Sequence, residues 1–239
     1  MSGGAAGRSL LALLPDPPLL VITDRYQSTL ALEKVAEAVF AAGCRWMSVR
    51  EKDLLPQERI SLLQRVCGVA ARWGAVVSVH GDLRAATMLP GVDLHLPAGA
   101  DARAARALLG PGALVGRSAH AGDPLAGPDM AALNYVTLSP VFTSASKPGY
   151  GPATGLDGLT AAVREAAVPV IALGGVGIGN IRACLDAGAA GVAVMGEVMR
   201  AADPGWVVAR MLGEVAAPSQ CHSIPCIGPG LAAGDPGRG

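Results

Sequence analysis

The strongest constraint on this chain comes from two short apolar runs that end in glycine and continue directly into helix-like segments. They occupy residues 168–176 and 191–196 and are rich in valine and other strand-forming residues. Buried parallel strands followed by crossover helices have this form. Two such units in tandem are typical of the closing strands of a barrel, so they predict an α/β fold of the (β/α)8 TIM barrel class.

The same alternation of strand and helix recurs through the preceding part of the chain. A length of 239 residues suits a single domain of this class. The fifth helical segment, residues 122–133, is expected to form only a broken turn or two, because Pro124 and Pro128 interrupt it. Strands are expected at residues 19–24, 45–51, 75–80, 93–97, 113–119, 135–142, 169–175 and 191–196. Helices are expected at residues 29–42, 56–72, 82–88, 101–109, 155–166, 178–187 and 204–215.

The two ends of the chain and one internal loop depart from this pattern. We predict a flexible N-terminal arm at residues 1–18, the barrel at residues 19–216 and a disordered C-terminal tail at residues 217–239. The tail is dominated by Pro, Gly, Ser and Ala, which bury too little surface to order a segment. Residues 143–154 have no periodicity, and a long loop at this place in a barrel is expected to be a lid or a binding loop.

Charge and cysteine content limit the classes of partner. Nineteen basic and nineteen acidic side chains give a formal net charge of zero, so neither nucleic-acid binding nor a polybasic membrane contact is expected. No segment approaches the length needed to span a bilayer. Five cysteines form no even disulfide framework, which predicts a reducing, cytoplasmic location. Cys221, His222 and Cys226 lack a fourth zinc ligand, so a solvated tail is favoured over a metal site there.

In a barrel of this kind, functional groups collect where each strand passes into the following loop. Glycine after the last two strands lets an anion approach the backbone, so Gly175 and Gly196 are candidates for a phosphate site. Tight turns alone are the alternative interpretation of these glycines. We expect a phosphorylated small molecule with one or more histidines over its reactive part. The polar residues at these strand ends are Thr23, Asp24, Arg25, Arg50, Glu51, Lys52, His80, Asp82, His95, Arg117, Ser118, His120, Ser139 and Lys147.

Seven short motifs stand in order and with compatible spacing along the chain. One of them reads Gly116-Arg-Ser-Ala-His120. The others lie at residues 23–25, 49–53, 95–96, 139–147, 172–176 and 189–194, the last with 200–204. Together, over about residues 19–212, they resemble the thiamine-phosphate synthase / TenI superfamily. The resemblance implies an enzyme of thiamine biosynthesis whose partner is a small phosphorylated thiazole.

That superfamily contains two activities, and they differ in their use of metal. Thiamine-phosphate synthases join hydroxymethylpyrimidine pyrophosphate to thiazole phosphate, and the resemblance implies Mg²⁺ held by two aspartates. Those positions fall on Gly81 and Ala100 here. Asp82 and Asp101 are each one residue away, but a hard cation needs oxygen ligands in fixed places. The glutamine before the Arg-x-Lys pair is Ser48 in this chain. No metal site is therefore predicted.

The TenI-type thiazole tautomerases lack those aspartates and resemble this chain at residues 96–99 and 116–120. The resemblance assigns the proton carrier to His120, and an imidazole that titrates near neutrality can both remove and deliver a proton. The reaction turns an exocyclic-alkene dihydrothiazole carboxylate phosphate into the aromatic thiazole, without a cofactor. We predict this tautomerase. The substrate-binding residues are expected to be Arg50, Lys52, His80, Ser118, Lys147, Gly175 and Gly196.

Other functions stay open from the sequence. The first is the magnesium-dependent synthase, the second a non-catalytic sensor of thiazole phosphate, and the third a zinc hydrolase whose metal is held by the three strand-end histidines, without a clear carboxylate ligand. Arg50 and Lys52 could instead pair with carboxylates at the rim of the barrel. Glu197, directly after Gly196, would repel a phosphate there unless its side chain points outward. A homo-oligomer is compatible with the sequence.

Overall fold

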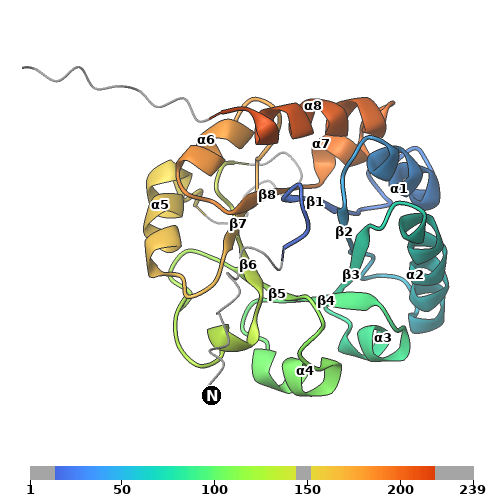
Figure 1. The fold of residues 1–239 in the computed structure, drawn as a ribbon, viewed down its shortest axis with the longest axis horizontal. Coiled ribbons are helices and arrows are strands. Elements are labelled where there is room, and N and C mark those ends of the chain that lie inside the picture. Colours follow the sequence, from blue (N-terminus) through green and yellow to red (C-terminus); the bar gives the residue numbers. More distant parts are fainter. Residues whose placement is uncertain (1–13, 144–151, 219–239) are drawn as a thin grey trace, which may run out of the picture.

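The computed structural model describes residues 14–143 and 152–218 (Figure 1). Several predictions fall outside these residues. They concern most of the N-terminal arm, the substrate-binding role of Lys147, most of the loop expected at residues 143–154, and the tail with Cys221, His222 and Cys226. The expected flexibility of the two ends therefore stays a prediction.

Within the described residues, eight parallel strands close into one barrel with helices around its outside (Figure 1). Each strand pairs with its neighbours in chain order, and β1 closes the barrel on β8 with Leu19 opposite Val192. The strands are β1 (Leu19–Ile22), β2 (Trp46–Val49), β3 (Val76–His80), β4 (Val92–Leu96), β5 (Val115–Ala119), β6 (Tyr135–Leu138), β7 (Val170–Ala172) and β8 (Gly191–Val194). The predicted single (β/α)8 domain is confirmed.

The helices begin where the sequence offers starting signals. Proline stands at the first position of α2 and α8, where a missing N–H costs nothing. Aspartate side chains cap α3, α4 and α8 by accepting a backbone N–H. The fifth helical segment is reduced to the 3-10 helix η2 (Met130–Ala132), as its prolines predict. The α-helices are α1 (Leu32–Ala41), α2 (Pro56–Ala71), α3 (Leu83–Met88), α4 (Ala102–Leu109), α5 (Gly155–Glu165), α6 (Ile181–Asp186), α7 (Gly196–Met199) and α8 (Pro204–Ala216).

Several strands are shorter than predicted. β6 stops shortly before Pro140, which has no N–H to donate to a neighbouring strand, although the Phe142 N–H still donates to the Gly174 carbonyl at 2.9 Å. Gly196, predicted as the end of β8, is instead the first residue of the four-residue helix α7. The reason is that the pairing of β8 with β1 ends at Val194.

Side chains inside the barrel change character along the strands. Near the amino-terminal ends they are apolar and buried, with Trp46 and Tyr135 in edge-to-face contact at a centroid distance of 4.8 Å. Alternate residues of a strand share a face, so the next inward positions lie above this layer. These positions carry four buried polar residues that we call the polar floor: Ser48, Ser78, His95 and Thr137. Apolar side chains therefore fill the amino-terminal end of the barrel, and hydrogen-bonding side chains lie beneath its carboxyl-terminal mouth.

Asp93 on β4 gives stability a component that depends on pH. Burial raises the pKa of its carboxyl to about 6, although the N–H of Leu114, 2.8 Å away, and the charge of Arg106 act in the opposite direction. The folded protein therefore retains this proton after the unfolded chain has released it at about pH 4. The free energy of unfolding therefore has its full value below about pH 4, where the carboxyl is protonated in both states. It falls as pH rises from about 4 to about 6, because only the unfolded chain then gains from releasing the proton.

Asp93→Asn is expected to remove this loss, because the amide oxygen can still accept the Leu114 N–H without carrying a charge. Relative to the wild type, the variant should gain about 2–3 kcal/mol in free energy of unfolding between pH 4 and pH 7. Urea unfolding at both pH values measures the difference. Asp16→Asn, at an exposed residue before β1, is the matched control and should follow the wild type. An unchanged pH dependence in Asp93→Asn would contradict the expectation.

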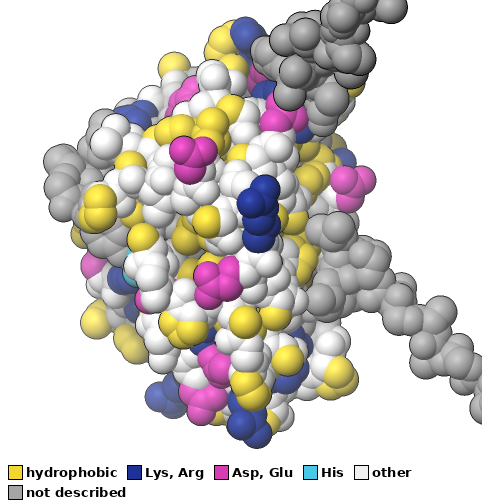
Figure 2. Space-filling model, turned by 90° about the vertical axis from the view of Figure 1, so that its left-hand side faces the viewer, with side chains coloured by type: hydrophobic (Ala, Val, Ile, Leu, Met, Phe, Trp, Pro, Cys, Tyr) yellow, Lys and Arg dark blue, Asp and Glu magenta, His cyan; other side chains and the backbone are white. Residues whose placement is uncertain are grey.

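Charge does not single out a site on the face shown in Figure 2. On the face shown in Figure 2, acidic and basic side chains are interspersed among apolar and neutral ones, in keeping with the formal net charge of zero. Across residues 14–143 and 152–218, no helix combines the length and the apolar character that crossing a membrane requires.

Candidate active site

Polar side chains from neighbouring strands meet at the carboxyl-terminal mouth of the barrel. His80 stands opposite His95 in the pairing of β3 with β4, and the two ring centroids are 4.9 Å apart. On β5, the hydroxyl of Ser118 lies 3.1 Å from Nε2 of His95. The structure therefore brings His80 and Ser118, both predicted from the sequence, to opposite sides of one buried imidazole. Their role in substrate binding stays a prediction.

His95 is a buried, neutral group and is unsuited to carry protons near neutral pH. Its exposed fraction is 1%. Burial, with a smaller contribution from the charge of Lys52, lowers the pKa of His95 to about 3. Nδ1 lies 3.0 Å from the Tyr135 hydroxyl, and Nε2 is engaged by Ser118. These contacts favour the structural interpretation of His95 over a catalytic one.

His120, after β5, is oriented by two backbone contacts. The ring Nδ1 lies 2.8 Å from the carbonyl oxygen of Ser139, and the backbone N–H of His120 donates to Asp123 Oδ2 at 2.8 Å. A carbonyl oxygen can only accept, so Nδ1 carries the hydrogen and Nε2 of the neutral ring carries the lone pair. The ring is half-buried at the mouth. It is therefore presented as a base with a fixed tautomer.

Arg50 and Lys52 follow β2, and they flank Glu51, which is hydrogen-bonded to Thr23 of the neighbouring strand end. The Thr23 hydroxyl donates to the buried Glu51 carboxylate at 2.7 Å and accepts the Arg50 N–H at 2.9 Å. Partial burial and then the charge of Arg50 lower the pKa of Lys52. Neither cation forms an ion pair with another described residue. Two neighbouring cations at the mouth provide positive charge that a bound anion would neutralise.

Gly175, predicted to hold phosphate, has a second reason to be glycine. Its φ is +64°, and a Cβ there would lie 2.5 Å from the Thr143 carbonyl oxygen and 2.7 Å from Phe142 Cβ. The chain after β6 thus passes directly over this glycine, as a tight-turn role requires. Substitution of Gly175 by valine would therefore disturb the packing of residues 142–143 before it reported on phosphate binding.

Glu197 resolves a question that the sequence leaves open. This exposed residue follows Gly196 in α7, and its Oε2 lies against Gly177, where any added Cβ would overlap it. The carboxylate therefore turns towards the loop after β7 rather than outward. It lies on the side of the barrel where the phosphate of a ligand is expected, so its charge would oppose a phosphate bound there.

Glu197→Gln should consequently tighten the binding of thiazole phosphate. Removal of one like charge at an exposed site is worth about 1 kcal/mol, so we expect about a 3-fold to 10-fold lower Kd by calorimetry. Glu165→Gln, at the exposed end of α5, is the matched control and should leave the Kd unchanged. Weaker binding by Glu197→Gln would show that the carboxylate supports the site instead.

The residues present do not fit the two-aspartate magnesium site. Gly81 and Ala100 offer no side-chain oxygen. Asp82 is committed to the start of α3, where it accepts the Ala85 N–H at 2.9 Å, and it also pairs with Arg59. Asp101 accepts the Ala104 N–H at 2.9 Å at the start of α4. Among the described residues, no three His, Cys, Asp or Glu side chains are grouped as a metal would require, the zinc interpretation included.

One predicted residue points away from the mouth. Arg117 alternates with Ser118 along β5, so it faces the helices and donates to Asp129, to the Ala100 carbonyl and to Met130 Sδ. It is therefore a structural residue and not part of the site.

Two residues beneath the mouth were not predicted to take part in the site. Tyr135 and Thr137 stand at alternate positions of β6 and both contact His95. Polar residues at period two in an otherwise apolar strand are the sequence signal that could have identified them.

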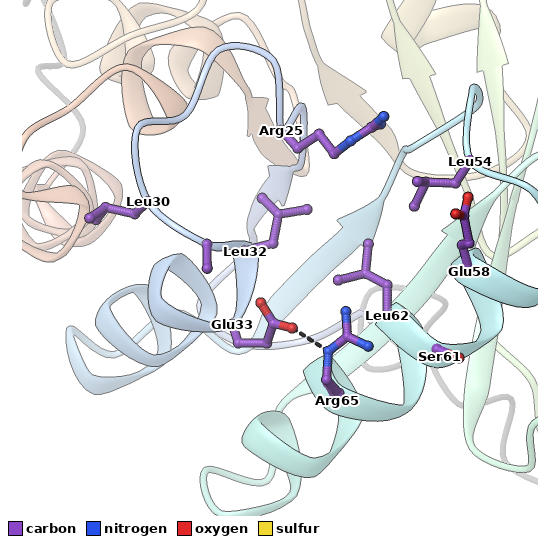
Figure 3. Close-up of a pocket in the computed structure, with 10 residues that line it drawn as sticks. Arg25, Leu30, Leu32, Glu33, Leu54, Glu58, Ser61, Leu62 and Arg65 are labelled. Atoms are coloured by element: carbon purple, nitrogen blue, oxygen red, sulfur yellow. Dashed lines mark hydrogen bonds and ion pairs between the residues drawn. The ribbon is translucent and has the colours of Figure 1, made fainter.

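A pocket on the outside of the barrel is separate from this constellation. It has a volume of about 440 Å³ and lies between α1 and α2, where Figure 3 shows Glu33 paired with Arg65. Its lining includes Leu30, Leu54 and Leu62 but none of the predicted site residues. The candidate active site is therefore the mouth of the barrel.

Comparisons with known proteins agree on one family. The family profile described as "Thiamine monophosphate synthase" matches residues 19–198. A Geobacter sulfurreducens protein with the provisional name of thiamine-phosphate synthase is 36% identical over 191 residues, which cover 79% of this chain and 90% of that protein. The thiamine-phosphate synthase of Myxococcus xanthus is 32% identical over 191 residues, or 80% of this chain and 88% of that protein.

Solved structures share the fold. A thiamine phosphate pyrophosphorylase from Pyrococcus furiosus has a TM-score of 0.73 and 24% identity, covering 87% of this chain and 98% of that one. A 3-hexulose-6-phosphate synthase has a TM-score of 0.59 and 22% identity, covering 82% and 99%. Because proteins with different names share this barrel, the fold by itself does not decide the reaction.

Proposed function

Because the chain belongs to the thiamine monophosphate synthase family, we propose that it acts in thiamine biosynthesis on a thiazole phosphate, as a TenI-type thiazole tautomerase. The observation that carries this choice is the orientation of His120. Its Nδ1–H is held by the Ser139 carbonyl at 2.8 Å, which leaves Nε2 as the nitrogen that accepts a proton.

The reaction needs only proton transfer. His120 Nε2 takes a proton from a saturated carbon of the dihydrothiazole ring, and one proton is delivered to the exocyclic alkene carbon. One C–H bond breaks and one forms, so no oxidant, reductant or metal enters the balance. A histidine in one fixed tautomer suits both steps, since the imidazolium formed first can return the proton.

Anion recognition places the ring against that histidine. Arg50 and Lys52 supply positive charge at the mouth after β2, and the half-buried Ser118 hydroxyl lies at the same mouth on β5. The substrate carries both a phosphate and a carboxylate, so cations on this side and backbone N–H groups near the ends of β7 and β8 would orient it at two points.

Thiamine-phosphate synthase is the second candidate, and the names of the relatives favour it. Against it stand Gly81 and Ala100, together with the commitment of Asp82 and Asp101 to helix starts. A sensor that binds thiazole phosphate without turnover is the third. The three candidates differ in the reaction, if any, that the purified protein should catalyse.

A single set of assays on the purified protein separates the candidates. We expect aromatisation of the dihydrothiazole carboxylate phosphate that is unaffected by EDTA. We also expect no detectable thiamine phosphate from pyrimidine pyrophosphate, thiazole phosphate and Mg²⁺. Ready, magnesium-dependent synthesis of thiamine phosphate would overturn the tautomerase in favour of the synthase. Binding of thiazole phosphate with neither reaction would leave the sensor.

A further inference from the structure

We propose that His95 is a positioning residue: Tyr135 fixes its tautomer so that Nε2–H donates to Ser118, which turns the Ser118 hydroxyl outward as a donor to an oxyanion of the ligand. The identity of that ligand, a thiazole bearing phosphate or carboxylate, rests on the proposed function. The tautomer is a property of the protein alone.

Three side chains form a continuous line from the interior of the barrel to its mouth. Tyr135 is fully buried and His95 has an exposed fraction of 1%. The Tyr135 hydroxyl lies 3.0 Å from His95 Nδ1, and His95 Nε2 lies 3.1 Å from the Ser118 hydroxyl. Ser118 is half-buried, two residues before His120. A change of proton position at one end of this line is thus passed to the other.

The phenol of Tyr135 decides the direction of the first hydrogen bond. Among the described residues, His95 is the group that meets hydrogen-bond geometry with its hydroxyl. The buried Ser78 hydroxyl does not meet hydrogen-bond geometry with the phenol. If His95 donated to Tyr135, the phenolic hydrogen would be buried without an acceptor of suitable geometry among the described residues, which is unfavourable. Tyr135 therefore donates to Nδ1.

The second nitrogen of the ring then carries the hydrogen. A neutral imidazole has one N–H, and with Nδ1 as acceptor that N–H is on Nε2. Nε2 faces the Ser118 hydroxyl at 3.1 Å and the Thr137 hydroxyl at 3.4 Å. One N–H can be shared between two acceptors, whereas in the other tautomer two hydroxyls would compete for one lone pair. Ser118 accepts from the ring, so its own hydrogen points elsewhere.

An outward hydroxyl donor at this place selects the chemistry of its partner. Ser118 lies at the mouth together with the positive charge of Arg50 and Lys52, so the group that suits all three is an oxyanion. A hydrogen bond to a charged acceptor is worth more than a neutral one. Because the hydroxyl is oriented before the ligand arrives, the ligand does not bear the cost of ordering it.

The tautomer can be measured without any ligand. Long-range ¹⁵N–¹H correlation spectra of histidine-labelled protein should show His95 protonated at Nε2 and bare at Nδ1. The signals are assigned by contacts to the Tyr135 ring and by their loss in His95→Gln. Tyr135→Phe removes the donor and should shift the ring towards protonation at Nδ1. Protonation of His95 at Nδ1 in the wild type would overturn the proposal.

A double-mutant cycle then tests the link to the ligand. Tyr135→Phe should weaken binding of thiazole carboxylate phosphate by about 3-fold to 10-fold when Ser118 is present, but less than about 2-fold in a Ser118→Ala background. Equal losses in both backgrounds would mean that Tyr135 acts by packing, which would refute the inference. Repeating the cycle with thiazole phosphate, which lacks the carboxylate, identifies the oxyanion that Ser118 contacts. The effect of Tyr135→Phe on binding should disappear with this ligand only if Ser118 contacts the carboxylate.

The outcomes keep the two proposals apart. If no thiazole ligand binds in the cycle, the proposed function fails, and the spectrum of the free protein still decides the tautomer. If thiazoles bind and turn over but His95 is protonated at Nδ1, only the positioning role fails.

Discussion

Replacing His120 by asparagine is expected to lower kcat for the aromatisation by about 100-fold to 10,000-fold, the range of a positioned acid-base group, with little change in affinity for thiazole phosphate. The amide can still donate to the Ser139 carbonyl, as Nδ1 does at 2.8 Å. It cannot accept and return a proton near neutrality. The loss of substrate absorbance measures kcat, and calorimetry measures the affinity.

The pH profile is the second readout for this variant. Wild-type kcat should depend on pH in a way that His120→Asn lacks, because the amide has no acid-base proton to gain or lose. The matched substitution on β3, His80→Asn, should raise KM more than it lowers kcat, because His80 is predicted to bind rather than to transfer protons. Nearly full kcat with an unchanged pH profile in His120→Asn would show that the ring only supports its loop. The chemistry would then pass to His80.

Gly116→Ala is expected to destabilise the barrel by about 2–4 kcal/mol, more than most single substitutions. A Cβ at this position would overlap three atoms of the Tyr135 ring. Tyr135 is fully buried and in edge contact with Trp46, so a displaced ring would disturb the neighbouring core side chains. Urea unfolding gives the loss in free energy of unfolding.

Gly68→Ala is the matched control for that measurement. Gly68 lies on the exposed side of α2, and the space around an added Cβ is open. The same substitution there should be neutral or stabilising by up to about 1 kcal/mol, because alanine favours helices. A Gly116→Ala protein as stable as the wild type would mean that the Tyr135 ring can be displaced, and the close packing of the interior would be disproved.

The sequence predicts the barrel well because its signals are local. Each strand is an apolar run of a few residues and each helix repeats apolar residues within one or two turns. Strand ends were less accurate, since they depend on the neighbouring strand. Pairing of β8 with β1 ends at Val194. The residues that follow carry no clear helix-start signal, so the sequence does not predict that Gly196 begins a helix.

The candidate site was predicted in part. Strand ends identify His80, Ser118 and His120 because parallel strands bring their carboxyl ends to one edge. The contact of His95 with Tyr135 joins residues 40 positions apart, and no local pattern encodes it. Arg117 was placed wrongly, although strict alternation with Ser118 along β5 would have turned it outward.

The loops after β3 and β4 can accept side chains that this chain lacks. Gly81 has a φ of +74° and open space where a Cβ would stand, and aspartate is among the residues that best tolerate such a backbone. Asp82 and Asp101 start their helices whatever residue precedes them. Aspartate at positions 81 and 100, introduced one at a time, should therefore leave the barrel folded. The capacity to gain carboxylates at the mouth thus lies in these two loops and needs no change in the strands.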